Sequence, residues 1–301
     1  MNRKILIAPS TFAKDDLAPL EKLQKWGAEI IMNPFGRKLT KEELVELLPG
    51  VTGMIAGLEP LNREVFLKSA LRVISRCGAG LDNVDLQAAN DLGIRVCSTP
   101  DAPTAAVAEL TVGSMIILAR RVLQMDQALH GGRWEKQVGF QLCGKSVLVI
   151  GFGRIGRAVA RLVQPFGPRL LVVDPYLQGP VDGFRALSLG EALPQADVIT
   201  IHASGREEIL GDAEFSLMKR GVLLLNASRG DVIREASLVK ALEQGVVAGA
   251  WIDTFSQEPY AGPLVRFPQV VLTPHIGSYS IQCRNRMEME AVENLLAAFE
   301  E

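Results

Sequence analysis

Cysteine and histidine are scarce in this chain of 301 residues, which has four cysteines and three histidines. The cysteines lie far apart, at Cys77, Cys97, Cys143 and Cys283, and none belongs to a C-x-x-C pair. Zinc sites and redox motifs need cysteines that are closer together in the sequence. The sequence therefore predicts no redox motif and no metal site. This cysteine usage is typical of a reduced, cytoplasmic protein.

An excess of charge of either sign is also missing. The chain has 32 Lys and Arg against 34 Asp and Glu, spread along its length, for a net charge of −2. We therefore expect neither a nucleic-acid surface nor a membrane surface. The most apolar long stretch, 105–119, carries Glu109 and is shorter than the roughly 20 residues that a membrane span needs. Met1 to Lys4 runs directly into an apolar strand, so no secretory leader is expected.

The first hundred residues alternate short apolar runs with amphipathic segments. The runs predict strands at 4–8, 29–33, 51–56, 72–75 and 94–97. Helices are predicted between them at 17–26, 40–49, 62–70 and 84–92, and Thr40 with Glu43 makes a capping box for the second helix. This alternation predicts a small doubly wound parallel sheet.

A second, larger α/β region follows the segment 99–103, which has the Pro-rich composition of a domain crossing. A helix at about 104–122 and a polar arm through Trp134 lead into it, and the arm has too few core residues to pack on itself. Strands are predicted at 146–150, 169–174, 198–202, 222–226, 248–253 and 270–273, with helices at 213–218 and 235–244. A final amphipathic helix at 281–299 is expected to pack back on the first domain.

Three glycines follow the strand at 146–150 with G-x-G-x-x-G spacing, at Gly151, Gly153 and Gly156. The first glycine allows a tight turn, the second lets the backbone approach a pyrophosphate, and the third lets the next helix pack closely. That helix would direct its free N–H groups at the phosphates. An ordinary strand–turn–helix with incidental glycines is the alternative, but the strand before and the helix after favour a dinucleotide site.

Asp174 ends the next strand, roughly 20 residues after the glycines, as the dinucleotide fingerprint requires. Its carboxylate would accept hydrogen bonds from the adenosine ribose hydroxyls. The four residues at 175–178 include no Arg or Lys that could meet a 2′-phosphate. The sequence therefore predicts NAD rather than NADP as the cofactor.

Polar residues also stand at later strand ends, where Arg229, Glu258 and His275 are the candidates for chemistry. An arginine holds a carboxylate in two hydrogen bonds, a histidine moves a proton near neutral pH, and a carboxylate beside it orients the ring. Near a nicotinamide, such a set interconverts a 2-hydroxy acid and a 2-keto acid. Each residue alone also has a structural interpretation, as a surface ion-pair partner, a solvated acid or a packed loop histidine, and spacing does not show that Glu258 and His275 meet.

Two loops leave strand ends in the first domain, at 57–60 and 76–80. The second is rich in glycine and presents consecutive backbone N–H groups that suit an anion, although a plain flexible turn has the same composition.

The chain resembles the D-isomer-specific 2-hydroxyacid dehydrogenase family, and most of all its phosphoglycerate dehydrogenase-like branch. The order and spacing of the motifs carry the resemblance nearly from end to end. They are 76–85 (RCGAGLDNVD), 99–109 (TPDAPTAAVAE), 151–156 (GFGRIG), 226–231 (NASRGD), Asp253 with 258–259 (EP), and 274–278 (PHIGS).

The resemblance implies two doubly wound parallel-sheet domains, a Rossmann NAD-binding domain at 99–280 and a flavodoxin-like substrate domain at 1–98 plus 281–301. It implies that Arg229 binds the substrate carboxylate and carbonyl, that His275 is the acid/base, and that Glu258 pairs with it. The implied substrate-binding residues are Cys77, Gly78, Ala79 and Gly80. The implied cofactor-binding residues are Thr104, Val107, Gly151, Gly153, Arg154, Ile155, Gly156, Asp174, His202, Ala227, Arg229, Asp253, His275 and Gly277.

The implied activity is hydride transfer between NAD and a small D-2-hydroxy acid, such as 3-phosphoglycerate or a glycerate- or glyoxylate-type acid, in a homodimer formed through the helix and arm at 103–140. An NADH-sensing co-repressor-like scaffold is the alternative, and the Arg, Glu and His set argues against it. A Rossmann enzyme of other chemistry, such as methyl transfer, fits poorly with Asp174.

Three departures from the family pattern bear on these expectations. The segment 203–206 is shorter than the Pro-rich one common in the family, which puts local cofactor contacts in question. Glu59 stands on a loop where phosphoglycerate enzymes commonly have a basic residue, so it should repel a substrate phosphate; with Leu58 and Cys77 it is expected to shape the side-chain pocket. No regulatory domain follows Phe299, so feedback control through one is not expected.

Overall fold

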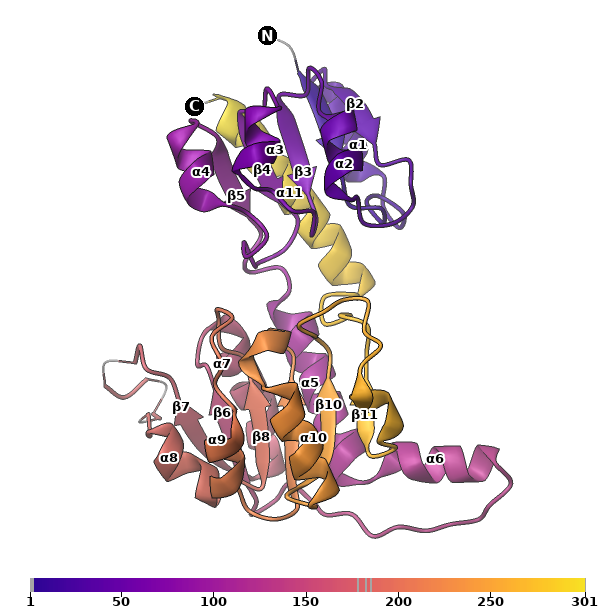
Figure 1. Cartoon of the computed structure of the whole chain (residues 1–301), viewed down its shortest axis with the longest axis vertical. Coiled ribbons are helices and arrows are strands. Elements are labelled where there is room, and N and C mark those ends of the chain that lie inside the picture. The colour runs from indigo at the N-terminus through magenta and orange to yellow at the C-terminus, as the bar shows by residue number, and fades with distance from the viewer. Residues whose placement is uncertain (1–2, 178, 182, 185, 301) are drawn as a thin grey trace. The chain divides into compact units, whose positions relative to one another are not determined.

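The computed structural model describes residues 3–177, 179–181, 183–184 and 186–300 (Figure 1). Its contacts divide the chain into two compact units. The first unit joins the segment ending at Pro103 to the segment that begins at Tyr279, and the second unit is Thr104–Ser278. The predicted assignment of domains to substrate and cofactor, with its boundaries, stays a prediction.

The first unit is built on a five-stranded sheet. Its strands are β1 (Lys4–Ile7), β2 (Glu29–Met32), β3 (Gly53–Ala56), β4 (Val73–Arg76) and β5 (Arg95–Ser98). All of them pair in parallel, in the order β2-β1-β3-β4-β5. This is the flavodoxin-like order, and it confirms the fold class predicted for this part of the chain.

Helices cover both faces of the first sheet because its strands alternate apolar side chains between two cores. Ile5 and Ile7 pack in one core with Leu23 and Leu295, whereas Leu6 packs in the other. The first core joins α1 (Ala18–Lys25) and α11 (Ile281–Glu300), and the second joins α2 (Lys41–Leu47), α3 (Arg63–Leu67) and α4 (Leu86–Asp91). The capping box predicted at the start of α2 is confirmed: Thr40 and Glu43 exchange side-chain-to-backbone hydrogen bonds.

The second unit is built on a six-stranded parallel sheet. Its strands are β6 (Ser146–Ile150), β7 (Arg169–Val173), β8 (Val198–Ile201), β9 (Val222–Asn226), β10 (Val247–Ile252) and β11 (Val270–Leu272). Their order is β11-β10-β9-β8-β6-β7, so the direction of winding reverses at β6. All residues of β6, β8 and β9 are buried, which explains their continuous apolar runs. The predicted Rossmann-type architecture is confirmed, and ligands of such sheets bind beyond the strand ends at the reversal.

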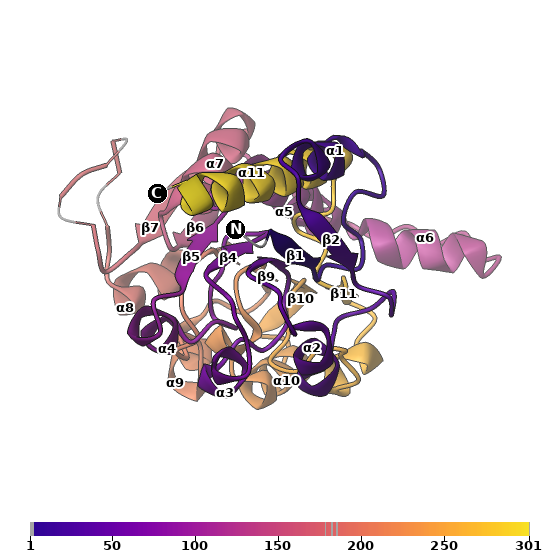
Figure 2. The ribbon, with the colours of Figure 1, turned by 90° about the horizontal axis from the view of Figure 1, so that it is seen from above.

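Helices also cover both faces of this sheet (Figure 2). On one face lie α5 (Thr104–Ala119) and α7 (Arg154–Val163), and on the other α8 (Leu189–Ala192), α9 (Asp212–Leu217) and α10 (Glu235–Glu243). Short 3-10 turns occur at Gln164–Phe166, Leu193–Gln195, Gly230–Val232 and Pro263–Arg266.

The region after α5 corrects two predictions. The helix expected to run to about Val122 ends at Ala119, and the polar arm, for which no helix was predicted, contains α6 (Val122–His130). Arg121, with a left-handed φ of 52°, ends the first helix and starts the second. α6 and the loop after it extend away from the sheet of the second unit in both views (Figures 1 and 2). The predicted absence of a core in the arm holds, since Leu129, Trp134 and Val138 are 56%, 80% and 91% exposed.

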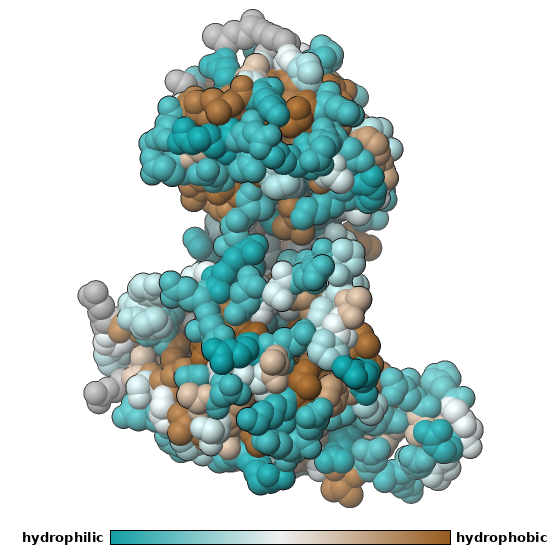
Figure 3. All heavy atoms as spheres, in the orientation of Figure 1, coloured by the Kyte–Doolittle hydropathy of each residue, from teal (hydrophilic) through white to brown (hydrophobic). Residues whose placement is uncertain are grey.

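The surface agrees with the balanced composition. On the face drawn in Figure 3, hydrophilic residues dominate both units and apolar residues gather only in small patches. No helix in the described part of the chain is both long and apolar enough to span a bilayer.

Candidate active site

The glycine loop joins β6 to α7 at the point where the winding of the second sheet reverses. Gly151 has φ 87°, and a Cβ atom there would lie 2.5 Å from the backbone nitrogen of Ala203. A Cβ on Gly156 would collide with the carbonyl oxygen of Gly151. Gly153, the N-cap of α7, has no atom within 4 Å of its Cβ position, so space is open over the first helical turn, which begins with Arg154 and Ile155. This cradle, with helix N–H groups at its floor, fits a dinucleotide pyrophosphate.

Asp174 lies directly after β7 and is tied to the glycine loop. Its Oδ2 accepts a hydrogen bond from the backbone N–H of Phe152 at 2.7 Å, and its Oδ1 accepts one from Tyr176 N–H at 2.9 Å. Each carboxylate oxygen can accept a further bond, as the predicted ribose contact requires. Gln178, the last of the four positions searched for a basic residue, lies outside the described residues.

His202 follows β8 and borders the same loop. Its Nε2 shares a hydrogen bond of 2.8 Å with the hydroxyl of Thr200, and its buried Nδ1 has no partner among the described residues. Burial lowers the pKa of His202 to about 3, so the ring is neutral at physiological pH. His202 therefore suits the predicted contact with a cofactor better than a role in proton transfer.

Arg229 is held by a turn after β9. The buried Asn226 accepts hydrogen bonds from the N–H and hydroxyl of Ser228 at 3.0 and 2.8 Å, and donates one to the carbonyl of Arg229 at 2.9 Å. The half-buried guanidinium of Arg229 donates to the carbonyl of Ser228 at 2.8 Å. This turn fixes Arg229 at the carboxyl edge of the sheet.

Gly230 brings the loops after β9 and β10 into contact. A Cβ atom at Gly230 would overlap the backbone of Phe255 and Ser256, so no other residue fits without moving one of the loops. The contact places the segment of Arg229 against the segment that ends at Glu258.

Asp253 ends β10 and is 1% exposed. Its Oδ1 accepts hydrogen bonds from the hydroxyl of Thr273 at 2.5 Å and from Ile276 N–H at 2.9 Å, and its Oδ2 accepts one from Gly277 N–H at 2.8 Å. Burial raises the pKa of Asp253, and the Thr273 bond is the strongest influence that lowers it. The three donors lie on either side of His275, so Asp253 anchors the loop that carries it.

His275 and Glu258 meet in space, which residue spacing alone left open. The Nδ1 of His275 lies 3.0 and 3.1 Å from the two carboxylate oxygens of Glu258. Because an ionised carboxylate only accepts, Nδ1 carries the hydrogen and donates it, leaving Nε2 for another partner. Both side chains are about one-third exposed, at 36% and 33%, so a ligand can reach them. The acid/base role itself stays a prediction.

The start of α5 lies beside the same loop. Val107 is buried, and its Cγ2 is 3.2 Å from the position a Cβ on Gly277 would take. The hydroxyl of Thr104 is buried and has no hydrogen-bond partner among the described residues. Ala227 follows Asn226 at the end of β9 and packs on the core that the sheet forms with α5 and α7. The second unit thus holds every predicted cofactor-binding residue at or near the carboxyl ends of its strands.

In the first unit, the predicted anion loop at 77–80 has fewer donors than its sequence suggests. The N–H of Cys77 donates to the carbonyl of Ala56, and that of Gly78 donates to the hydroxyl of Thr99, both at 2.8 Å. The amides of Ala79 and Gly80 make no hydrogen bond within the described part of the chain. Burial raises the pKa of the Cys77 thiol to about 12, so this side chain is neutral.

Glu59 is buried rather than presented to solvent. It is 1% exposed, and its Oε2 accepts a hydrogen bond from Gly57 N–H at 2.7 Å. Burial raises the pKa of Glu59, with Lys38 and Arg76 acting in the opposite direction. Its carboxylate closes its own loop, and the predicted repulsion of a substrate phosphate stays a prediction.

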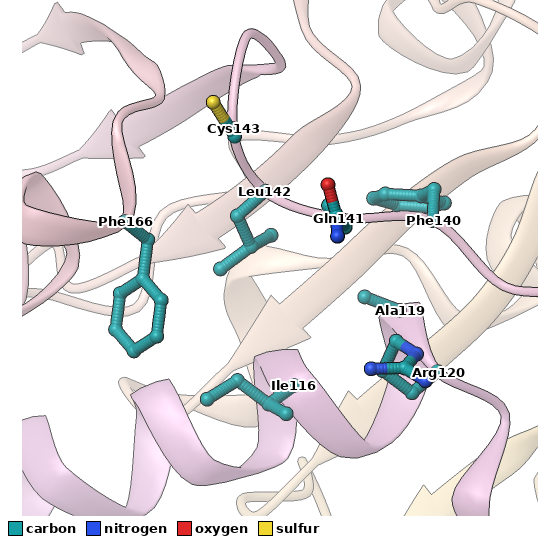
Figure 4. Close-up of a pocket in the computed structure, with 8 residues that line it drawn as sticks. All are labelled: Ile116, Ala119, Arg120, Phe140, Gln141, Leu142, Cys143 and Phe166. Atoms are coloured by element: carbon teal, nitrogen blue, oxygen red, sulfur yellow. The ribbon is translucent and has the colours of Figure 1, made fainter.

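A hollow of about 350 Å³ lies elsewhere in the second unit (Figure 4). Ile116, Leu142 and Phe166 form its apolar walls, and Arg120 and Cys143 lie at its edge. Cys143 precedes β6, whereas Gly151 follows it, so the hollow is at the opposite edge of the sheet from the cofactor loop. Among the described residues, no cluster of three His, Cys, Asp or Glu side chains could hold a metal ion.

Sequence reasoning missed three residues that organise this site, namely Asn226, Trp251 and Thr273. Asn226 holds the turn of Arg229, and the indole Nε1 of Trp251 donates to the hydroxyl of Thr273 at 2.9 Å. A polar side chain at the end of a fully apolar strand was the available signal, because a buried polar group needs a partner.

Comparison with known proteins agrees with this geometry. The sequence model of the "D-isomer specific 2-hydroxyacid dehydrogenase, NAD binding domain" matches residues 112–277. A D-3-phosphoglycerate dehydrogenase of Sus scrofa is 35% identical over 94% of this chain and 54% of its own length. A glyoxylate reductase of Korarchaeum cryptofilum is 33% identical over 86% of this chain and 82% of its own.

The TT0316 protein of Thermus thermophilus has a similar solved structure, with a TM-score of 0.90 and 35% identity over 99% of this chain and 97% of its own. The chain spans about half the length of the phosphoglycerate dehydrogenases that it matches.

Proposed function

Because the chain belongs to the D-isomer-specific 2-hydroxyacid dehydrogenase family, we propose that it is an NAD-dependent oxidoreductase that interconverts a small D-2-hydroxy acid and its 2-keto acid. The observation that carries this proposal is the pairing of His275 with Glu258 at 3.0–3.1 Å in the unit that holds the glycine cradle. A scaffold that only sensed NADH would have no use for an oriented acid–base pair.

The proposed chemistry assigns one task to each side chain. When bound, the nicotinamide supplies or accepts the hydride. Arg229 binds the substrate carboxylate and polarises its carbonyl through charge-assisted hydrogen bonds. His275 gives a proton from Nε2 to the oxygen of the keto acid in reduction and takes it back in oxidation. Glu258 holds the ring through Nδ1 and stabilises its protonated form.

The loop of the first unit has a binding task in this proposal. The amides of Ala79 and Gly80 are donors without a partner in the described chain, so they are the proposed anion-binding groups at that loop. Arg76 donates to the carbonyl of Cys77 at 2.5 Å and adds a positive charge beside them. The proposed substrate is an acid with a small, unphosphorylated substituent, and the buried Glu59 is the proposed barrier to a phosphate group.

Spectrophotometry of NADH oxidation tests the function. The panel contains glyoxylate, hydroxypyruvate, pyruvate and phosphohydroxypyruvate, each offered to the purified chain with NADH and with NADPH. The proposal predicts turnover of at least one keto acid, with the unphosphorylated acids preferred. NADH binding without turnover of any panel member would point instead to a sensing scaffold.

A homodimer through the segment 103–140 is part of the proposal. The exposed apolar side chains of Leu129, Trp134 and Val138 support it, because a lone chain would leave them in water. Light scattering should therefore report twice the 32.6 kDa chain mass. A Leu129→Asp, Val138→Asp variant should report a single chain, and a monomeric unaltered chain would remove this part of the proposal.

A further inference from the structure

Trp251 is the largest fully buried side chain in the molecule's core. It lies in β10, two residues before Asp253, and belongs to the core that also contains Ala108 and Val112 of α5. Its indole Nε1 donates a hydrogen bond to the hydroxyl of Thr273 at 2.9 Å. The side chains around it in this core are apolar, so the indole N–H needs an acceptor and finds it in the hydroxyl of Thr273.

The indole sets the direction of the next hydrogen bond. An indole N–H can only donate, so the hydroxyl of Thr273 is the acceptor in that bond. The hydroxyl has one hydrogen of its own, and the carboxylate oxygen Oδ1 of Asp253 lies 2.5 Å away. The hydrogen of Thr273 therefore points at Asp253, and the chain runs in one direction from Trp251 through Thr273 to Asp253.

The carboxylate of Asp253 must accept in each of its three hydrogen bonds if the chain from Trp251 is to keep this direction. Besides the Thr273 hydroxyl, it receives the backbone N–H groups of Ile276 and Gly277 at 2.9 and 2.8 Å. A protonated carboxyl group is a weaker acceptor than a carboxylate, so protonation would weaken these bonds. Burial favours that protonated form, and each directed donor opposes it.

The geometry of His275 depends on the same anchor. Thr273 precedes His275 by two residues, and Ile276 and Gly277 follow it directly. His275 itself has φ 55°, a left-handed conformation that residues with a side chain seldom adopt. Three bonds to one carboxylate hold the loop in this form, which aims Nδ1 at Glu258.

We propose that Trp251 and Thr273 are positioning residues for the acid–base site, acting through the directed chain from the indole to the hydroxyl to Asp253 to hold the loop of His275. This inference rests on the proposed oxidoreductase function. Neither residue touches the reacting atoms in this proposal; both act on the orientation of the His275 ring.

The kinetics of three variants, Thr273→Val, Thr273→Ser and Trp251→Phe, test the hydrogen-bond chain from Trp251 to Asp253. Thr273→Val keeps the shape and removes the hydroxyl, and should lower kcat about 10–100-fold with little change in the KM of the keto acid. Thr273→Ser should restore most of the loss. Trp251→Phe should lower kcat about 2–10-fold, because the hydroxyl loses its fixed direction but keeps its hydrogen. The double variant Trp251→Phe, Thr273→Val should be no slower than Thr273→Val alone, since the two residues act in series.

Val270→Ala is the matched control for lost packing. Val270 is buried on β11 and has no part in the chain, so this variant should lose thermal stability and keep its kcat. Multiplied losses in the double variant, or a Thr273→Val enzyme as fast as the parent, would overturn the proposal.

Ring ¹⁵N spectra of the histidines give a readout that needs no turnover. The chain has only three histidines, so the signals of His275 can be assigned from single His→Gln variants. At a pH where the ring is neutral, His275 should show one tautomer with hydrogen on Nδ1 in the parent and averaged signals in Thr273→Val. If the signals differ between parent and Thr273→Val but the parent turns over no keto acid, the result would contradict the proposed function and support the hydrogen-bond chain. If the parent turns over a keto acid and the signals of Thr273→Val are unchanged, the result would contradict only the hydrogen-bond chain.

Discussion

The Nδ1 atom of His275 lies 3.0 Å from Oε2 and 3.1 Å from Oε1 of Glu258. Glu258 has a second partner, since its Oε1 accepts the backbone N–H of Phe255 at 3.1 Å. The same carboxylate therefore orients the ring and closes the loop after β10. A substitution at Glu258 can separate these two effects only if it keeps an oxygen in the place of Oε1.

Glu258→Gln makes that separation. The amide oxygen can still accept from Phe255, so the loop should keep its form, but the negative charge that stabilises a protonated His275 is lost. We expect kcat to fall about 10–100-fold with an unchanged melting temperature. Steady-state kinetics and a thermal melt check this together. A variant with the parent's kcat would show that the pair has no role in proton transfer.

Gly230→Ala should disable the site from a position that bears no functional group. The added Cβ would overlap the backbone of Phe255 and Ser256, so the loops that carry Arg229 and Glu258 must separate. We expect loss of most turnover and a lower melting temperature. Gly190→Ala is the control, because nothing lies within 4 Å of its Cβ position. Equal activity in both variants would mean that the contact between the loops is dispensable.

In the proposed function, the cofactor preference depends on Asp174. We expect the parent to use NADH far more efficiently than NADPH, because a 2′-phosphate would meet the Asp174 carboxylate. Asp174→Ser should narrow the ratio of the two kcat/KM values, at some cost to both cofactors because the bond to Phe152 N–H is also lost. If the parent has comparable kcat/KM values for NADH and NADPH, Asp174 does not set the cofactor preference.

The pH dependence of reduction should report Asp253. Reduction consumes a proton, so a loss of kcat on the acid side points to a carboxylate that the site needs in its charged form. Burial raises the pKa of Asp253 above the ordinary 3.8, so its charge is lost as pH falls through a window above that value. In that window we expect kcat to fall as the pH is lowered, both for the parent and for Glu258→Gln. Asp253→Asn should show no such fall, and its kcat should be low at every pH. An unchanged fall in Asp253→Asn would assign it to another group.

Much of the fold followed from sequence pattern because burial imposes periodicity. The strand at 146–150 is apolar at nearly every position since both its faces are covered. Gly151 and Gly156 stand where a Cβ atom would meet backbone, and Gly153 stands where the space is open. The arm was harder to predict. Ala128 is the buried residue of α6, so the helix carries no core-facing periodicity, and a single left-handed residue, Arg121, separates it from α5.

The three polar candidates of the site could be predicted from the sequence, but their connections and the residues that hold them in place could not. Strand ends of a parallel sheet gather at one edge, which is why Arg229, Glu258 and His275 could be selected together. Hydrogen bonds between side chains depend on rotamers that no periodicity records. The donor from Trp251 to Thr273 and the burial of Glu59 were therefore visible only in three dimensions.

The central claim is that His275 transfers the proton in an NAD-linked interconversion of a keto acid and a hydroxy acid. The rate of NADH oxidation by His275→Ala, measured beside the parent on the best keto acid of the panel, tests it most directly. We predict a loss of about 10²–10⁴-fold in kcat while NADH binds with unchanged affinity. A His275→Ala enzyme that reduces the keto acid at the parent's rate would contradict the account.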